Sequence, residues 1–153
     1  MFIKTIKVKK PTTALTAIII AVIAIIAIVA IITHKLGSPA VYELKTENAR
    51  QDFMQEMGWN VSEEYDQCKV VVIPDEFNDV YNKYNDLQRE QGFDLRKYKG
   101  KTVEIYTYSV YNYDNYENKD CIKCHLMICD GILIGGDVSS TEIDGFMQGL
   151  RKN

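Results

Sequence analysis

The fold is decided by residues 122–138, which read IKCHLMICDGILIGGDV and place a turn signal between two apolar runs. Asp130-Gly131 favours a type I′ β-turn, because both central residues of that turn need a positive φ. Both runs are apolar on both faces near the turn, so we expect this hairpin to lie centrally in an antiparallel sheet. Gly135-Gly136 in the second run predicts a bulge or a close approach of the backbone.

Two more strands are expected upstream of the hairpin. From Lys101 the side chains alternate with a period of two, so that Val103 and Ile105 share one face. Residues 69–73 are mostly β-branched and are followed by a proline, which predicts a buried strand. Residues 111–118 are rich in Asn, Asp and Tyr and predict a loop, which suits either recognition of a protein or glycan or an inert connection.

Two helices complete the expected domain. The first begins at an N-cap, Thr46, and ends before Gly58. The second is capped by Asp75 and ends at Gly92, and its apolar face consists of Phe77, Val80, Tyr81, Tyr84 and Leu87. A short helical tail is expected at the C-terminus. The sequence therefore predicts an α+β domain, in which an antiparallel sheet is covered on one face by two helices.

The N-terminal part of the chain has the pattern of a membrane anchor. From Ala14 to Ile32 every residue is apolar except Thr16, and a helix of this length spans about 28 Å, close to the hydrocarbon core of a bilayer. We expect a basic tail at 1–13, a transmembrane helix at 14–33, a linker at 34–45 and the α+β domain at 46–153. A cleaved signal peptide is the alternative reading.

Charge sets the expected orientation of this anchor. Residues 1–35 sum to +5 and residues 36–153 sum to −8. The lysines before the apolar segment place the N-terminus in the cytoplasm and the domain outside the membrane. The acidic domain argues against nucleic acid as a partner. Four alanines recur on one stripe of the helix and suit close packing of a homodimer, namely Ala14, Ala17, Ala21 and Ala24.

Several short motifs distinguish the domain from a generic α+β sequence. They are Gly58-Trp59-Asn60-Val61, Ile73-Pro74 with Phe77, the run from Val80 to Gln88, Gly92-Phe93-Asp94-Leu95, Tyr98-Lys99-Gly100-Lys101, and the run from Ile134 to Val138. With these motifs the chain from about Thr46 to Leu150 resembles the family of exported bacterial domains known as domain of unknown function 4830. The resemblance implies a membrane anchor followed by a small α+β domain, and it implies no activity.

Cys121-Ile122-Lys123-Cys124-His125 matches the attachment signature of c-type haem, in which two thioethers hold the porphyrin and the histidine ligates iron. Here the motif runs into a predicted strand, whereas haem attachment needs a helical turn. A thiol redox pair or a zinc site is a further reading of these residues. The plainest reading is that Cys68, Cys121, Cys124 and Cys129 are core thiols or form structural disulfides.

Catalytic signatures are missing from the sequence. It contains no Gly-x-Ser-x-Gly, no His-Glu-x-x-His and no phosphate loop, and His125 has no evident partner for acid–base catalysis. We therefore expect no cofactor, no metal and no catalytic residue. The expected function is a non-catalytic binding or sensing module on the outer side of the cell membrane, which contacts an envelope protein or a glycan. The alternative is a membrane-tethered haem or thiol redox protein that uses Cys121, Cys124 and His125.

Overall fold

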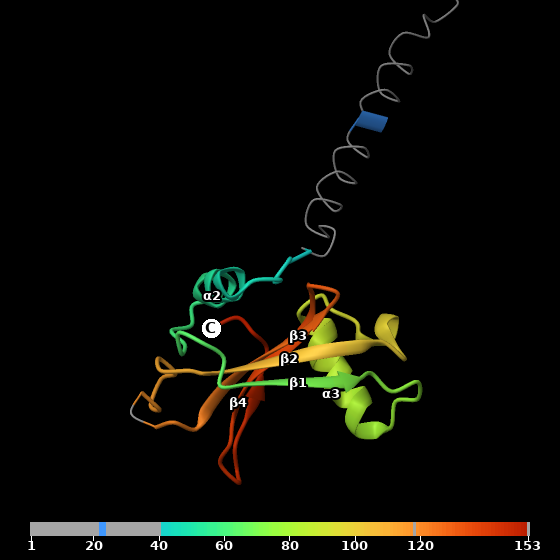
Figure 1. Cartoon of the computed structure of the whole chain (residues 1–153). Coiled ribbons are helices and arrows are strands. Elements are labelled where there is room, and N and C mark those ends of the chain that lie inside the picture. Colours follow the sequence, from blue (N-terminus) through green and yellow to red (C-terminus); the bar gives the residue numbers. More distant parts are fainter. Residues whose placement is uncertain (1–21, 24–40, 118, 153) are drawn as a thin grey trace, which may run out of the picture. The chain divides into compact units, whose positions relative to one another are not determined.

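The computed structural model describes residues 22–23, 41–117 and 119–152 (Figure 1). Residues 41–153 form a compact unit of their own. The elements of this unit follow the order α2 (Glu47–Glu56), β1 (Gln67–Val72), α3 (Asp79–Glu90), the 3-10 helix η1 (Leu95–Tyr98), β2 (Thr102–Ser109), β3 (Ile122–Cys129), β4 (Ile132–Ser140) and β5 (Met147–Gln148).

The predicted membrane segment falls almost entirely on residues that the structure does not describe. The basic tail, the helix at 14–33 with its four alanines, and linker residues 34–40 lie outside the described ranges, apart from Val22 and Ile23, which are helical. Among the described residues, none of the helices has the length and apolar character needed to cross a bilayer.

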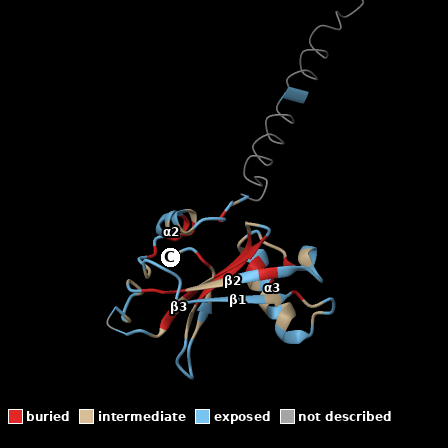
Figure 2. Cartoon of the chain, viewed as in Figure 1, coloured by how far each residue is buried: buried red, intermediate tan, exposed pale blue. Residues whose placement is uncertain are grey.

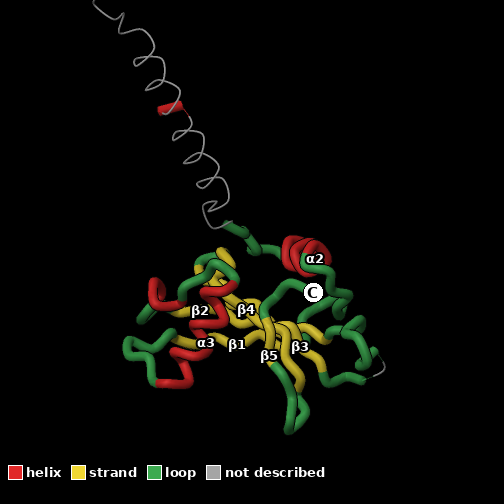
Figure 3. The backbone as a smooth tube through the Cα atoms, turned by 180° about the vertical axis from the view of Figure 1, so that it is seen from behind, coloured by secondary structure: helices red, strands yellow, loops and turns green. Residues whose placement is uncertain are grey.

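The five strands form one antiparallel sheet in the order β1-β2-β3-β4-β5 (Figure 3). The predicted central hairpin is confirmed, because β3 and β4 are joined by Asp130 and Gly131, whose φ values are 51° and 81°. The sheet is therefore built around the residues that carried the turn signal.

The predicted irregularity at Gly135-Gly136 is also confirmed. Ile128 pairs with Leu133, but the neighbouring Met127 pairs with Gly135, so that Ile134 is an extra residue on β4. A Cβ atom at Gly135 would lie 2.8 Å from Oε1 of Gln88, so α3 approaches the backbone closely here. Both alternatives that the glycines suggested hold at once.

The prediction that both helices cover one face is wrong. Phe53 and Met54 of α2 pack in a core with Leu126 on one face of β3. Met127 belongs to a second core on the other face of β3, and Tyr84 of α3 packs against this core. Its other buried members are Ile73, Leu95, Val103, Cys129 and Ile134. The physical reason lies in β3 and β4, whose residues are apolar on both faces and therefore need a cover on each side.

The strand expected to be buried is an edge strand. β1 pairs only with β2, and Val70 and Val72 are 66% and 58% exposed. Figure 2 shows β1 mostly in the colour of exposed residues, whereas β3 is largely buried. Only Val71 and the following Ile73 pack against the core on the α3 side. A short β-branched run is typical of edge strands as well as buried ones, which explains the error.

The helix boundaries confirm one predicted cap and correct another. The Thr46 hydroxyl accepts a hydrogen bond from the Ala49 N–H (3.2 Å), and Gly58 has a φ of 96° after the end of α2. α3 begins later than predicted, because Asn78 rather than Asp75 is its N-cap and accepts from the Tyr81 N–H. The expected helical tail is instead the two-residue strand β5, which pairs with β4.

A buried arginine ties α2 to the sheet. Arg50 is 5% exposed and donates to the Tyr108 hydroxyl (2.8 Å), to Glu47 (2.9 Å) and to the Leu44 carbonyl (3.1 Å). Tyr108 in turn donates to the other oxygen of Glu47 (2.9 Å). Burial alone would raise the pKa of Glu47, but hydrogen bonds from Arg50, Gln51 and Tyr108 hold it below its usual value.

This network predicts a pH dependence of stability. The lowered pKa of Glu47 stabilises the fold above the unfolded-state pKa, and this contribution is lost as the pH falls through the folded-state value. On going from about pH 6 to about pH 3, the wild type should lose about 1 kcal/mol more unfolding free energy than Glu47→Gln, the usual net size of a hydrogen bond. Urea denaturation of both proteins across this range measures the difference. Parallel losses in the two proteins would contradict it.

Candidate functional site

The cysteine–histidine motif is spread over both faces of the sheet. Cys121 lies half-buried just before β3, and Cys124 is fully buried in the core under α2. His125 is the next residue of the strand, so its side chain lies on the opposite face. The folded segment therefore does not direct Cys124 and His125 toward one group, as covalent haem would require. The haem reading thus lacks geometric support in the strand.

The four cysteines carry free thiols. Cys68 is exposed on β1, while Cys124 and Cys129 are buried. Burial raises the pKa of the Cys124 thiol well above its usual value, which makes it a poor nucleophile and a poor metal ligand. In the part of the chain that the structure describes, no three His, Cys, Asp or Glu side chains are grouped closely enough to hold a metal ion.

His125 has a partner that the sequence did not reveal. Its Nδ1 atom lies 3.1 Å from Oδ1 of Asp137, directly opposite on β4. The second carboxylate oxygen of Asp137 accepts a hydrogen bond from the Tyr84 hydroxyl of α3 (2.8 Å). The Asp137 side chain is 5% exposed and that of His125 is 29% exposed. A buried carboxylate therefore links a histidine of the sheet to a tyrosine of the helix.

The register of the hairpin explains why His125 and Asp137 meet. The turn pairs Cys129 with Ile132, and an unbroken ladder would then pair His125 with Gly136. The extra residue Ile134 shifts the pairing by one, which places Asp137 opposite His125. The signal was present in the turn and in the two glycines, because a bulge there changes the register of everything beyond it.

Tyr84 is held as a neutral hydrogen-bond donor. Burial, together with the neighbouring Asp137 carboxylate, raises the pKa of its hydroxyl far above the usual value. The same hydroxyl lies 3.5 Å from the Met127 sulfur. The ring of Tyr84 packs against the second core, in keeping with its predicted place on the apolar face of this helix, and its hydroxyl is bonded to Asp137.

These residues line an open groove between α3 and the sheet, which we call the His125 groove. Its volume is about 380 Å³, and its lining consists of Val71, Ile73, Val80, Tyr81, Tyr84, Ile105, His125, Met127, Asp137, Ser139 and Met147. Val80 is 74% exposed and Met147 is 52% exposed. A second hollow, of about 410 Å³, shares Ile105 and His125 with it. His125 thus stands where two depressions of one sheet face meet.

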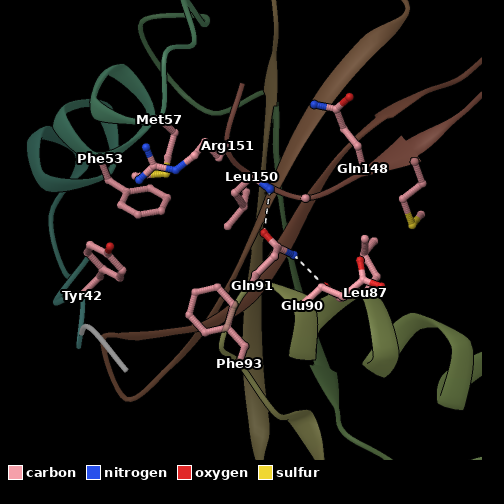
Figure 4. A pocket seen from close by; sticks show the side chains of 12 residues that line it. Tyr42, Phe53, Met57, Leu87, Glu90, Gln91, Phe93, Gln148, Leu150 and Arg151 are labelled. Carbon is pink, nitrogen blue, oxygen red and sulfur yellow. Dashed lines mark hydrogen bonds between the residues drawn. The ribbon is translucent and has the colours of Figure 1, made fainter. Parts of the chain in front are cut away.

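A larger cleft lies near α2, the end of α3 and the C-terminal segment, with a volume of about 600 Å³. Figure 4 shows Phe53 and Met57 on one side of it and Gln91 and Phe93 on the other. The Gln91 amide is fully engaged, because it accepts from the Leu150 N–H (2.6 Å) and donates to the Leu87 and Gly136 carbonyls. The Gln91 side chain thus holds the C-terminal segment in place, and we interpret the cleft as a structural junction rather than a ligand site.

Ser109 and Lys123 form a pair that resembles a serine–lysine catalytic dyad. The Lys123 ammonium donates to the Ser109 hydroxyl (2.7 Å). Burial alone would lower the pKa of Lys123, but Asp120 and Asp66, at 2.8 and 3.2 Å, raise it above its usual value. The lysine is therefore held protonated and cannot take the proton of Ser109, which is itself only 5% exposed.

The loop predicted at residues 111–118 is largely anchored to the domain through its tyrosines. Tyr113 stacks on Trp59 (5.7 Å between ring centroids) and on Phe146 (4.5 Å), and its hydroxyl donates to Gln148. Tyr116 also packs against Phe146. These contacts favour the reading of the loop as a structural connection over that of a recognition surface.

Comparison with known proteins identifies the family. The family model described as "Domain of unknown function (DUF4830)" matches residues 53–138, a range that includes Tyr84, His125 and Asp137. No curated protein and no solved structure matches the chain. The match covers more than half of the chain, and the protein therefore belongs to the DUF4830 family.

Proposed function

We propose that the protein is a single-pass membrane protein whose extracytoplasmic domain is a non-catalytic binding or sensing module, with the His125 groove as its ligand site. The observation that carries this proposal is the groove itself. It is open, its walls are mostly apolar, and two of its polar side chains, Tyr84 and His125, converge on the buried carboxylate of Asp137. Ligand sites in proteins usually combine an apolar lining with a few fixed polar groups in this way.

The anchored location rests on the sequence alone. The apolar segment at 14–33 has the length of a membrane span, and the lysines before it favour a cytoplasmic N-terminus. With the domain outside the membrane, an envelope protein or a glycan is the expected partner. Packing of the alanine stripe in the membrane would allow a homodimer.

The absence of catalysis is supported by the state of the polar groups. Asp137 engages both of its oxygens, one with Tyr84 and one with His125. The pair of Ser109 and Lys123 is locked by two carboxylates. An arrangement in which each group is fixed in one bonding state suits recognition better than proton transfer.

Binding in the groove can be tested with indole as an apolar probe and the full chain in lipid nanodiscs. The chain contains two histidines, His34 and His125, so 15N-labelling at histidine alone gives few signals, and a His34→Gln variant isolates those of His125. Indole should shift the His125 signals of the wild type in a saturable way. Val80→Arg puts a charge beside the groove and should weaken this binding about tenfold, the effect of losing the apolar contact that bound indole would make with Val80.

Val70→Arg is the matched control for this experiment. Val70 is also a highly exposed valine, but it lies on β1 outside the groove. It should bind indole as the wild type does. If indole leaves the His125 signals unchanged, or if both variants weaken binding equally, the groove is not the binding site.

A further inference from the structure

The chemistry of the ligand follows from the way Asp137 orients His125. An ionised carboxylate can only accept hydrogen bonds. One of its oxygens accepts from Tyr84 (2.8 Å), and the other lies 3.1 Å from Nδ1 of His125. In the neutral imidazole, the shared proton must therefore sit on Nδ1, which leaves Nε2 as a hydrogen-bond acceptor.

The Nε2 atom is turned away from Asp137, because the ring presents Nδ1 to that residue. None of the described residues forms a hydrogen bond with Nε2. His125 lines both hollows, and its side chain is 29% exposed, so that a ligand can reach the ring. His125 thus offers a hydrogen-bond acceptor that none of the described residues engages, on a side chain that lines the mostly apolar groove.

We infer that the His125 groove binds an apolar or aromatic group that carries one hydrogen-bond donor, a hydroxyl or an indole or amide N–H, which it presents to Nε2 of His125. This inference rests on the proposed function, since it specifies what the same groove takes. The donor is the part of the ligand that gives orientation, and the apolar walls supply the contact area.

Other ligand classes fit the groove less well. An anion would approach the buried carboxylate of Asp137, and the nearby ammonium of Lys123 is already paired with Asp66 and Asp120. The Tyr84 hydroxyl is already committed to Asp137, so a ligand with only an acceptor would depend on the hydroxyls of Tyr81 and Ser139. Such a ligand would also leave Nε2 without a partner once water is displaced, which costs free energy.

The test compares indole with 1-methylindole, which has nearly the same apolar surface but no N–H donor. The histidine-labelled full chain in nanodiscs is titrated with each probe, at a pH where the 15N shifts report a neutral ring protonated at Nδ1. At equal free concentrations, indole should bind about five to ten times more tightly than 1-methylindole, the effect of one hydrogen bond to an otherwise unpaired acceptor.

Each outcome separates the inference from the proposed function. Equal affinity for the two probes, a preference for 1-methylindole, or 15N shifts that place the proton on Nε2 overturn the inference while the groove stands as a binding site. If neither probe shifts the His125 signals, the proposed function fails and the inference fails with it.

Asp137→Asn gives a second test that uses the same readout. In asparagine an NH2 group replaces one of the two oxygens, so Tyr84 and His125 can no longer each donate to an oxygen of their own. The proton is then no longer held on Nδ1, and the preference for indole should fall to about one while 1-methylindole binds as before. A preference that persists with an unchanged tautomer would overturn the role assigned to Asp137.

Discussion

Replacing Gly136 by alanine is expected to destabilise the domain by about 3 kcal/mol or more, in the range reserved for clashes in a core. A Cβ atom at this position would collide with the backbone carbonyl of His125 and would lie 2.9 Å from the Leu150 side chain. The carbonyl belongs to the central strand β3, which cannot shift without breaking its ladder with β2 and β4. The change therefore strains the sheet at its centre.

The same substitution acts on the candidate site. Gly136 precedes Asp137, and its N–H donates to Oε1 of Gln88 on α3 (2.8 Å). A displaced β4 should lengthen the contact between Asp137 and His125, so that binding of indole weakens together with stability. Thermal or urea unfolding of the full chain in nanodiscs measures the first effect, and the His125 titration measures the second.

Gly92→Ala serves as the control for this prediction. A Cβ atom at Gly92 would meet nothing within 4 Å, although the φ of 90° disfavours any residue other than glycine. This variant should lose only about 1 kcal/mol, the usual effect of alanine at a positive φ. If Gly136→Ala is no worse than Gly92→Ala, the backbone is not packed as closely at the bulge as the structure shows.

The hairpin could be predicted from sequence because its signals are local. Asp130-Gly131 specifies the turn, and the turn specifies the register of the strands that leave it. The bulge at Ile134 was foreseen through the two glycines beside it. The pairing of His125 with Asp137 does not follow from these features alone, because it depends on the exact position of the extra residue, which the sequence did not give.

The long-range parts could not be predicted in the same way. Tyr84 reaches Asp137 only because α3 packs on the face of the sheet opposite to α2. Helical periodicity shows which side of a helix is apolar, but it does not show which face of a sheet that side will cover. The exposure of β1 could not be predicted for the same reason. β1 is an edge strand, and its burial depends on whether another segment of the chain covers that edge.

The cysteines allow a prediction of a very large difference in labelling rate and a test of the membrane topology. Cys68 is exposed on β1, whereas Cys124 is 0% exposed and burial raises the pKa of its thiol. A maleimide reacts with an accessible thiolate, so Cys124 can react only when the core opens transiently. In the native chain Cys68 should react at least about a thousand times faster than Cys124.

The proposed orientation makes this reactivity visible from outside the cell. A membrane-impermeant maleimide added to intact cells should label Cys68 of the full chain, and Cys68→Ser should remove the fast label. The matched control is Lys4→Cys in the predicted cytoplasmic tail, which should label only after the membrane is permeabilised. Labelling of the Lys4→Cys thiol in intact cells, or protection of Cys68 there, would contradict the orientation.

Labelling of the denatured native chain distinguishes free thiols from the haem interpretation. The protein is denatured without reduction and then labelled to completion. The chain has four cysteines, and four free thiols take four labels, which intact-mass measurement counts directly. Thioether bonds from Cys121 and Cys124 to a porphyrin would leave two labels, with the mass of the haem added. Because Cys124 and His125 lie on opposite faces of β3, we expect four labels and a colourless protein. A count of two with added mass would mean that this strand does not form in the mature protein, and both the groove and its donor-binding role would then have to be abandoned.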